Sequence, residues 1–369
     1  MQRISIAQPS WDDEMRTAAI STLDSLRWVK GEQGKSFGLE FAKMCGAVHA
    51  TPCQSGSVAL WAALRLLNIG PGDEVIVPSF TYIATATCVS LVGATPVFVD
   101  VEQDYWCLDL NEVEKARNEH TKAVIGVHLF GQMYDPELIS WCLNHNIALI
   151  EDAAQAHGGG MLHDGDWKGA GACGDIGCFS FFPSKNMAVG GEGGMLTTTR
   201  PDISDRMRAF VNHGRDVTLE SLEVGSNLRL SEVSAAIGRV QLQRLPKWVE
   251  RRQSIAQRYT EAFLQIQGIE PPAVRPNSTH AWHQYCIRTH APQQLKTMMD
   301  ERGIDARMYY ATPCHRQKVY DSHPQFNQRL PNTDDLGSQL VAIPVHHQLS
   351  DDDVQRVISV VQECASTFN

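Results

Sequence analysis

Short apolar runs alternate with helical patterns through the first two-thirds of this chain. Each run is rich in Val, Ile and Phe and lies between Gly, Pro or Asp residues, which is typical of buried strands. The predicted strands are Glu74–Pro78, Thr95–Asp100, Lys122–Phe130, Ile147–Asp152, Cys178–Phe182 and Gly194–Thr198. Because continuous apolar runs with intervening helices favour a mainly parallel sheet covered on both faces, the pattern predicts an α/β fold.

The carboxyl ends of these predicted strands are where we expect a ligand. In an open α/β sheet, ligands bind in the crevice outside the carboxyl ends of the strands. Polar residues cluster directly after the apolar runs of this chain, and Asp152 and Lys185 are two of them. The chemistry of the protein is therefore expected at this edge of the sheet.

The chain is too long for one ordinary core, and its pattern changes near residue 242. Its 369 residues favour two domains, or one large α/β domain with an appendage. The segment Gln241–Gln265 is typical of a long, charged amphipathic helix, and a mixed α+β segment follows it. We predict a large domain over residues 1–245 and a small C-terminal domain over residues 246–369.

The charge balance argues against two classes of partner. The chain has 32 Lys and Arg against 42 Asp and Glu, a net charge of −10, whereas a nucleic-acid or anionic-membrane binder needs a basic face. We therefore expect neither nucleic acid nor membrane as a partner. A phosphorylated substrate stays open, because a local cluster can bind phosphate inside an acidic protein.

The cysteines and the N-terminus indicate a reduced, cytoplasmic protein. Ten cysteines are scattered without a C-x-x-C pair, so we expect no zinc site and no metal. The first ten residues lack the apolar core of a signal peptide. The most apolar stretch, Ile83–Val99, is broken by threonines, a glycine and a proline, which favours a helix, a turn and a strand over a membrane span.

Lys185 is the first candidate for chemistry. The apolar run that begins at Cys178 delivers this lysine to the ligand edge of the sheet, and a glycine-rich stretch at 190–194 leaves room for a flat ring. Most lysines are simply solvated. A lysine that attacks an aldehyde must be partly neutral, which requires a desolvated or cationic setting.

Asp152 is the second candidate, because it follows a buried strand. A buried carboxylate without a partner is expensive, and a pyridinium N–H is a fitting partner that keeps such a ring protonated as an electron sink. The alternative is that Asp152 caps the next helix. From its spacing alone the two interpretations are equally good, and Lys185 favours the first.

Two further motifs are weak signals by themselves. Ser55-Gly56-Ser57 opens an apolar helix, and free N–H groups at such a turn bind phosphate, although serines cap many helices that bind nothing. Tyr82 lies just past a strand, where an aromatic ring can cover a flat ligand or can equally belong to the core.

Taken together, these motifs resemble the DegT/DnrJ/EryC1/StrS family of sugar aminotransferases, which depend on pyridoxal 5′-phosphate (PLP). The resemblance covers nearly the whole chain. The motifs occur in the same order and with similar spacing as in the family, which makes the resemblance specific. They are Trp28–Gly31, Gln54–Leu60, Pro71–Tyr82, Val127–Gly131, Glu151–His157, Phe179–Asn186, Gly225–Glu232, Tyr310–His315 and Leu340–Pro344. The resemblance implies the fold-type-I architecture of aspartate aminotransferase, with a mixed seven-stranded sheet in the large domain.

The resemblance also implies the roles of single residues. Lys185 would form the Schiff base to PLP and shuttle the proton, and Asp152 would pair with the pyridine nitrogen. Gln155 would lie against the phenolic oxygen of PLP. The remaining cofactor contacts implied are Tyr82 on the ring, Gly56, Ser57 and Ser180 on the phosphate, and Asn227 on the phosphate of the neighbouring subunit. Where the family commonly has threonine, this chain has Ser57, which keeps the hydroxyl group. Where the family frequently has Phe or Trp, this chain has Tyr82, which keeps an aromatic ring.

The implied reaction moves an amino group from an amino acid, glutamate being expected, to a keto sugar linked to a nucleotide. The cofactor alternates between PLP and pyridoxamine 5′-phosphate (PMP), and the working unit would be a homodimer with composite active sites. The candidate substrate contacts are Lys30, Arg215, Arg229, Tyr310 and His315. The sequence leaves open the nucleotide, and whether C3 or C4 of a 6-deoxyhexose is aminated.

Four alternatives compete with this function. A cyclitol aminotransferase would act on a keto-inositol with the same donor reaction. A PLP-binding regulatory protein without turnover is disfavoured by the presence of Lys185, Asp152 and Gln155 together. A branch of the family with histidine at the lysine position dehydrates sugars, and Lys185 argues against that chemistry. A Rossmann module is unsupported, because no G-x-G-x-x-G follows an early strand.

Overall fold

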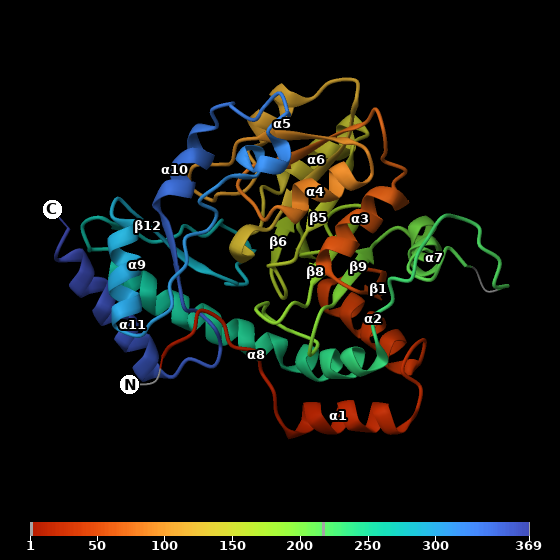
Figure 1. Ribbon diagram of the computed structural model, residues 1–369, viewed down its shortest axis with the longest axis horizontal. Helices are drawn as coiled ribbons and strands as arrows, with labels where there is room; N and C mark the ends of the chain where they lie inside the picture. The colour runs from red at the N-terminus through yellow and green to blue at the C-terminus, as the bar shows by residue number, and fades with distance from the viewer. Residues whose placement is uncertain (1–2, 216–217, 369) are drawn as a thin grey trace.

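A mixed seven-stranded sheet forms the centre of the computed structural model, which describes residues 3–215 and 218–368 (Figure 1). Its order is β1-β9-β8-β5-β4-β2-β3; β9 is antiparallel to both of its neighbours, and the other pairs are parallel. The strands are β1 (His49–Cys53), β2 (Glu74–Pro78), β3 (Thr95–Val99), β4 (Thr121–Val127), β5 (Ala148–Asp152), β8 (Ile176–Ser180) and β9 (Gly194–Thr198). The α/β fold and the seven-stranded sheet are confirmed.

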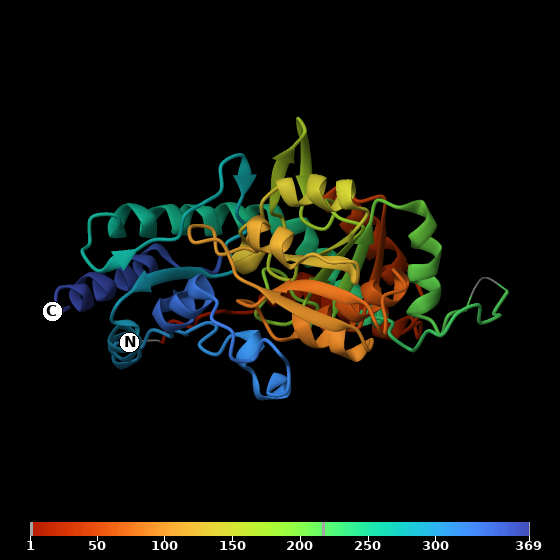
Figure 2. The ribbon, with the colours of Figure 1, turned by 90° about the horizontal axis from the view of Figure 1, so that it is seen from above.

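Helices cover both faces of this sheet, as the continuous apolar runs predicted (Figure 2). One face packs on α2 (Glu32–Cys45), α5 (Leu110–Ala116), α6 (Glu137–His145) and the first half of α8 (Glu232–Phe263). The other packs on α3 (Gly56–Leu66), α4 (Ala84–Leu91) and α7 (Pro201–Phe210). Successive strand residues alternate between the two faces of the sheet: Leu149 packs on the first face and Ile150 on the second.

A second, separate core lies toward the C-terminus. It is built on the last part of α8 and on the sheet β10-β12-β13, together with the N-terminal Ile4. Its elements are β10 (Ile269–Glu270), β12 (Tyr285–Thr289), β13 (Leu340–Ile343), α9 (Pro292–Glu301) and α11 (Asp351–Ala365). The boundary predicted near residue 245 falls inside α8, which runs unbroken through both cores and includes Pro246. The two-domain division stays a prediction, which the separate core supports.

The remaining elements lie around these two cores. Helix α1 (Asp13–Asp24) packs beneath α8, with Arg244 paired to Asp12 and Glu14 (Figure 1). A small three-stranded sheet joins β6 (Gly160–His163), β7 (Asp166–Gly169) and β11 (Ser278–Thr279). The short elements η1 (Leu129–Gly131), η2 (Cys314–Arg316), η3 (Lys318–Tyr320) and α10 (Pro331–Gln339) complete the fold. Among the described residues, no helix is long and apolar enough to cross a membrane.

Candidate active site

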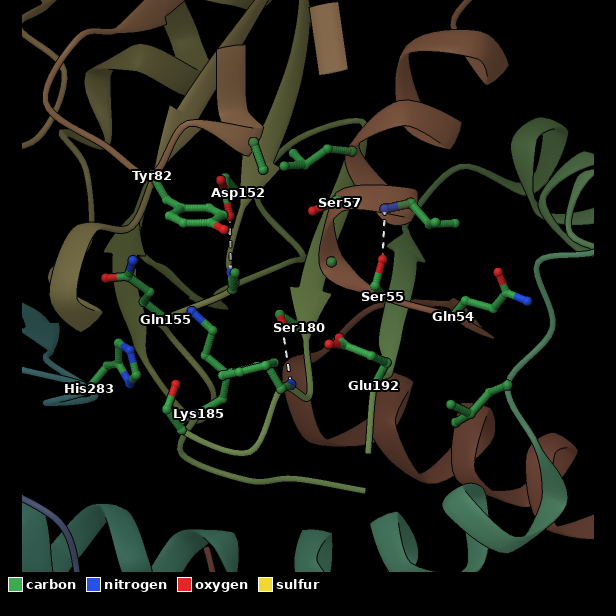
Figure 3. Close-up of a pocket in the computed structure, with 18 of the residues that line it drawn as sticks. Gln54, Ser55, Ser57, Tyr82, Asp152, Gln155, Ser180, Lys185, Glu192 and His283 are labelled. Atoms are coloured by element: carbon green, nitrogen blue, oxygen red, sulfur yellow. Dashed lines mark hydrogen bonds between the residues drawn. The ribbon is translucent and has the colours of Figure 1, made fainter. Parts of the chain in front are cut away.

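A cavity of about 860 Å³ opens at the carboxyl ends of β5 and β8. It lies where the crevice of an α/β sheet is expected to bind ligands. Figure 3 shows Asp152, Gln155 and Lys185 on one side of it and Ser55 and Ser57 on the other. The predicted site residues that line it are Gly56, Ser57, Tyr82, Asp152, Gln155, Ser180, Lys185, Arg229 and Tyr310.

One end of the cavity is suited to an anion, because helix α3 begins there. Ser55 is the N-cap, and its hydroxyl accepts the N–H of Val58 at 3.2 Å. The amides of Gly56 and Ser57 belong to the first turn, which has no acceptors inside the helix. A Cβ on Gly56 would lie 2.7 Å from the Cβ of Ser180, so only glycine lets this turn lie against the end of β8. Free amides and two hydroxyls therefore meet at a positive helix end.

The opposite end of the cavity holds the carboxylate of Asp152. This side chain is buried, and it accepts the hydroxyl of Thr85 at 2.8 Å and the N–H of Ala154 at 3.2 Å. Burial raises the pKa of the Asp152 carboxyl above its ordinary value, although these hydrogen bonds oppose the rise. The element after β5 is the strand β6, so Asp152 caps no helix. A cationic partner would lower the cost of this buried charge.

Lys185 lies on the turn after β8, on the same side of the cavity as Asp152 and Gln155 (Figure 3). Its backbone N–H donates to the carbonyl of Phe182 at 2.8 Å, and the neighbouring Asn186 anchors the turn by donating to the carbonyl of Ala281 at 2.7 Å. Burial lowers the pKa of the Lys185 ammonium to about 8, and the Asp152 carboxylate acts in the opposite direction. The neutral, nucleophilic form of this amine is therefore far more abundant near neutral pH than in a solvated lysine.

Tyr82 and Gln155 lie beside Asp152, on the side of the cavity away from Ser55 and Ser57 (Figure 3). The ring of Tyr82 is 58% exposed at the rim of the cavity, which leaves it free to cover a flat ligand. The amide of Gln155 accepts the N–H of Phe130 at 2.6 Å and donates to the hydroxyl of Tyr310 at 3.1 Å. Its position is therefore fixed before any ligand arrives.

Some residues that matter here were not predicted from the sequence. The hydroxyl of Thr85 donates to the carboxylate of Asp152. The sequence held a signal for this role, because Thr81 and Thr85 are four residues apart just after β2, and their hydroxyls lie 3.2 Å from each other in the structure. His283 and Gln284 line the wall beside Lys185, and burial lowers the pKa of His283 well below its ordinary value. They come from a segment about 100 residues further along the chain, for which no local pattern gave a signal.

Four of the predicted residues do not line the cavity in a single chain. Lys30, Arg215 and Asn227 are exposed outside it. His315 is fully buried elsewhere, with one ring nitrogen 2.5 Å from the hydroxyl of Ser79 and the other 3.1 Å from the carbonyl of Gln328. These two contacts give His315 a packing role in this chain, with no ring nitrogen left for a substrate.

The cavity fits PLP, and its donor set is the reason. The phosphate matches the free amides and hydroxyls at α3, the aldehyde matches the amine of Lys185, and the ring nitrogen matches the buried carboxylate of Asp152. No group of three or more metal-binding side chains occurs within residues 3–215 and 218–368. PLP-dependent transferases of fold type I hold their cofactor in such a crevice of a mixed sheet, and this is the class of the protein.

Comparison with known proteins narrows the class to a family. The model of the DegT/DnrJ/EryC1/StrS aminotransferase family matches residues 9–362. A UDP-N-acetyl-3-dehydro-alpha-D-glucosamine 3-aminotransferase from Acidithiobacillus ferrooxidans is 38% identical over 95% of this chain and 93% of its own length. The chain therefore belongs to the DegT/DnrJ/EryC1/StrS family, and it is a PLP-dependent sugar aminotransferase.

Two solved structures are similar over nearly their whole length. Streptomyces venezuelae DesV, solved in complex with a ketimine intermediate, has a TM-score of 0.92 and 35% identity, covering 98% of this chain and 100% of that one. A putative sugar aminotransferase from Streptococcus pneumoniae, solved in its PLP form, has a TM-score of 0.90 and 26% identity over 99% of each chain. These similarities confirm the predicted fold and support PLP as the cofactor.

Proposed function

We propose that this enzyme moves the amino group of L-glutamate to the C3 carbonyl of a nucleotide-linked keto hexose. The arrangement of the Lys185 amine, the Asp152 carboxylate and the start of α3 along one cavity carries the proposal. The similar enzyme from A. ferrooxidans supports the acceptor, because its name specifies a UDP-linked sugar with the carbonyl at C3.

The residues that hold the cofactor set up its chemistry. Bound PLP supplies an electron-accepting ring that stabilises negative charge at the α-carbon of the amino donor. Asp152 keeps the ring nitrogen protonated, because a buried carboxylate favours a cationic neighbour. Gly56, Ser57 and Ser180 bind the phosphate, and Tyr82 covers one face of the ring.

Lys185 moves the proton. With PLP bound, its neutral amine would take the proton from the α-carbon of glutamate and, as an ammonium, would return it at the former aldehyde carbon of the cofactor. A pKa of about 8 suits both directions, because neither protonation state is rare near neutral pH. The same group then works in reverse on the sugar carbon, while the enzyme alternates between its PLP and PMP forms.

The sugar diphosphate needs cations, and Arg229 is the candidate inside the cavity. Its Nη1 donates to the Asn212 side chain at 2.7 Å, and its buried Nε has no hydrogen-bond partner in the described part of the chain. A diphosphate oxygen would satisfy that N–H. Lys30 and Arg215 are exposed outside the cavity, so they reach a substrate only across a subunit interface.

We further propose a homodimer in which each cavity is completed by the partner chain. Large apolar side chains are exposed near the cavity and on the loop before α8, and burying them against a second copy would offset their contact with water. They include Trp28, Val29, Phe182, Leu219, Leu222 and Val224. Asn227 and Arg215 lie on or beside that loop, and we propose that in the dimer they contact the partner's cavity.

The cytoplasm is the proposed compartment. All ten cysteines are free thiols, and unpaired thiols are typical of a reducing environment. Nucleic acid is not a proposed partner, because the chain carries a net charge of −10.

The substrate proposal is tested with the PMP form of the enzyme. Excess glutamate converts the enzyme to this form, and dialysis removes the remaining glutamate. Nucleotide-linked 3-keto and 4-keto hexoses and a keto-inositol are then added separately, and recovery of the visible PLP band is followed. We expect recovery with the 3-keto sugar and little with the 4-keto sugar. Recovery only with a keto-inositol would instead identify a cyclitol aminotransferase, and no reaction with glutamate would favour a regulatory protein.

A further inference from the structure

The side-chain amide of Gln155 is held at both of its polar atoms. Its Oε1 accepts the backbone N–H of Phe130 at 2.6 Å, and its Nε2 donates to the hydroxyl oxygen of Tyr310 at 3.1 Å. A backbone N–H can only donate, so Oε1 must face Phe130 and Nε2 must face the other way. The amide therefore has one orientation, with one Nε2 hydrogen on Tyr310 and a second hydrogen still to be used.

The turn that supplies the Phe130 N–H is itself fixed. Phe130 lies in the left-handed region with φ of 57°, and its carbonyl accepts the backbone N–H groups of His283 at 2.8 Å and Gln284 at 3.2 Å. Behind the turn, His128 is hydrogen-bonded to the buried carboxylate of Glu151 at 2.9 Å. The Oε1 end of Gln155 therefore has a rigid anchor.

Tyr310 anchors the other end from a different part of the chain. Its ring stacks on the ring of Phe130, with centroids 6.1 Å apart and planes 9° apart, and meets Phe80 edge-on at 5.7 Å. It follows Arg307, whose backbone pairs with Ala342 at the end of the C-terminal sheet. Burial raises the pKa of Tyr310 above its ordinary value, so the hydroxyl stays neutral. The C-terminal segment thus delivers a fixed, uncharged acceptor to Gln155.

We propose that Tyr310 is a positioning residue, whose hydroxyl holds the Gln155 amide so that its second Nε2 hydrogen points at the phenolic oxygen of bound PLP. This role rests on the proposed function, because it requires PLP in the cavity. A hydrogen bond donated to the phenolic oxygen favours its anionic form. The hydroxyl of Tyr310 therefore sets the pH at which the visible spectrum of the holoenzyme changes, without contacting the reacting atoms.

The experiment is a spectrophotometric pH titration of the PLP-loaded enzyme without substrates. Tyr310→Phe removes the hydroxyl and keeps the ring stack on Phe130. Without that acceptor the amide is held at one end only, so its bond to the phenolic oxygen weakens. We expect the spectral midpoint to rise by about 0.5 pH unit, since one pKa unit corresponds to the loss of a strong hydrogen bond to a charged group.

The chain offers a matched control beside it. Tyr309 lines the same cavity, and its hydroxyl makes no hydrogen bond to any residue that the structure describes. Tyr309→Phe should leave the midpoint within about 0.1 pH unit of the wild-type value, because no partner of Gln155 is lost. An equal shift in both variants would overturn the positioning role, as would an unchanged midpoint in Tyr310→Phe.

A double-variant cycle separates a positioning role from direct contact with PLP. If Tyr310 acts through Gln155, adding Tyr310→Phe to Gln155→Ala produces no further shift of the midpoint. A further shift of the same size as in the wild-type background would mean that Tyr310 acts on PLP directly, and would overturn the proposal. Failure of the proposed function looks different: the wild-type protein would then show no PLP band, or would form no 2-oxoglutarate from glutamate.

Discussion

At the scale of single residues, burial and the carboxylate of Asp152 have opposite effects on the pKa of the Lys185 amine. Burial lowers the pKa of Lys185 to about 8, and the nearby carboxylate raises it. The neutral fraction of the Lys185 amine therefore increases as the pH rises through about 8, and this pKa is well below the ordinary value for a lysine.

We predict this titration in the PLP-free protein. The rate at which trinitrobenzenesulfonate labels Lys185, measured by peptide mass spectrometry, should rise with a midpoint near pH 8. In Asp152→Asn the midpoint should move lower, because the carboxylate that stabilises the ammonium is gone. A midpoint near that of a solvated lysine would show that the side chain is not desolvated.

Asp152 has a separate role in turnover. We predict that Asp152→Ala lowers kcat by more than about a hundredfold, or 2.7 kcal/mol of barrier, since the ring nitrogen loses its charged partner. Steady-state kinetics with saturating PLP measures this, and circular dichroism checks the fold. Because Thr85 holds the carboxylate, Thr85→Val should cause a smaller loss. Turnover of Asp152→Ala within about tenfold of wild type would leave this residue a structural role only.

Much of the site was predictable because its residues directly follow apolar strands. Asp152 and Lys185 were found from that pattern, and the family resemblance supplied the roles of Gln155 and Ser180. The wall formed by His283 and its neighbour was not predictable, because only the folded chain brings it beside Lys185. The buried position of His315 was also not predictable from the sequence, because its hydrogen-bond partners Ser79 and Gln328 are distant from it along the chain.

At the scale of elements, the start of helix α3 depends on one close approach. A Cβ at Gly56 would lie 2.7 Å from the Cβ of Ser180, whereas a Cβ at Gly191 would meet nothing within 4 Å. Gly56→Ala should therefore push the first turn of α3 away from β8 and separate the phosphate donors. Gly191→Ala is the matched control on the neighbouring glycine-rich turn.

We predict that Gly56→Ala weakens PLP binding by about tenfold or more, which equals about 1.4 kcal/mol, and that Gly191→Ala changes it by less than about twofold. Equilibrium titration of each PLP-free variant with PLP gives the dissociation constants. Equal affinities for the two variants would mean that the close approach of α3 to β8 does not build the phosphate site.

The sheet strands were predictable from apolar runs, but their ends were not always. Strands β2 and β9 have the predicted bounds, whereas β4 ends at Val127 because the chain then turns into η1. Strand β1 was missed, since His49–Cys53 includes a proline and has few apolar residues. The stretch Ile83–Val99 forms the predicted helix, turn and strand as α4 and β3.

At the scale of the whole molecule, α8 connects the two cores, and the exposed loop before it carries Asn227. In one chain this side chain is exposed and lines no part of its own cavity. A two-fold dimer would give each cavity an Asn227 from the other chain.

We predict that activity returns when two inactive variants are mixed after mild dissociation. One variant is Lys185→Ala, and the other is Asn227→Ala. In a mixed dimer one cavity would collect both defects and the other neither, so part of the turnover should recover. Demonstrated heterodimers without any recovery, despite a severe defect in Asn227→Ala alone, would mean that Asn227 serves its own chain.

The central claim is that Lys185 and PLP together convert glutamate in this cavity, and a single-turnover measurement tests it most directly. The PLP-loaded enzyme is mixed with glutamate in the absence of a sugar, and the visible PLP band and 2-oxoglutarate are followed together. We predict loss of the band with one 2-oxoglutarate formed per chain, and neither change in Lys185→Ala, because no other amine lines the cavity among the described residues. Full 2-oxoglutarate formation by Lys185→Ala, or none by the wild-type enzyme with PLP bound, would contradict the account.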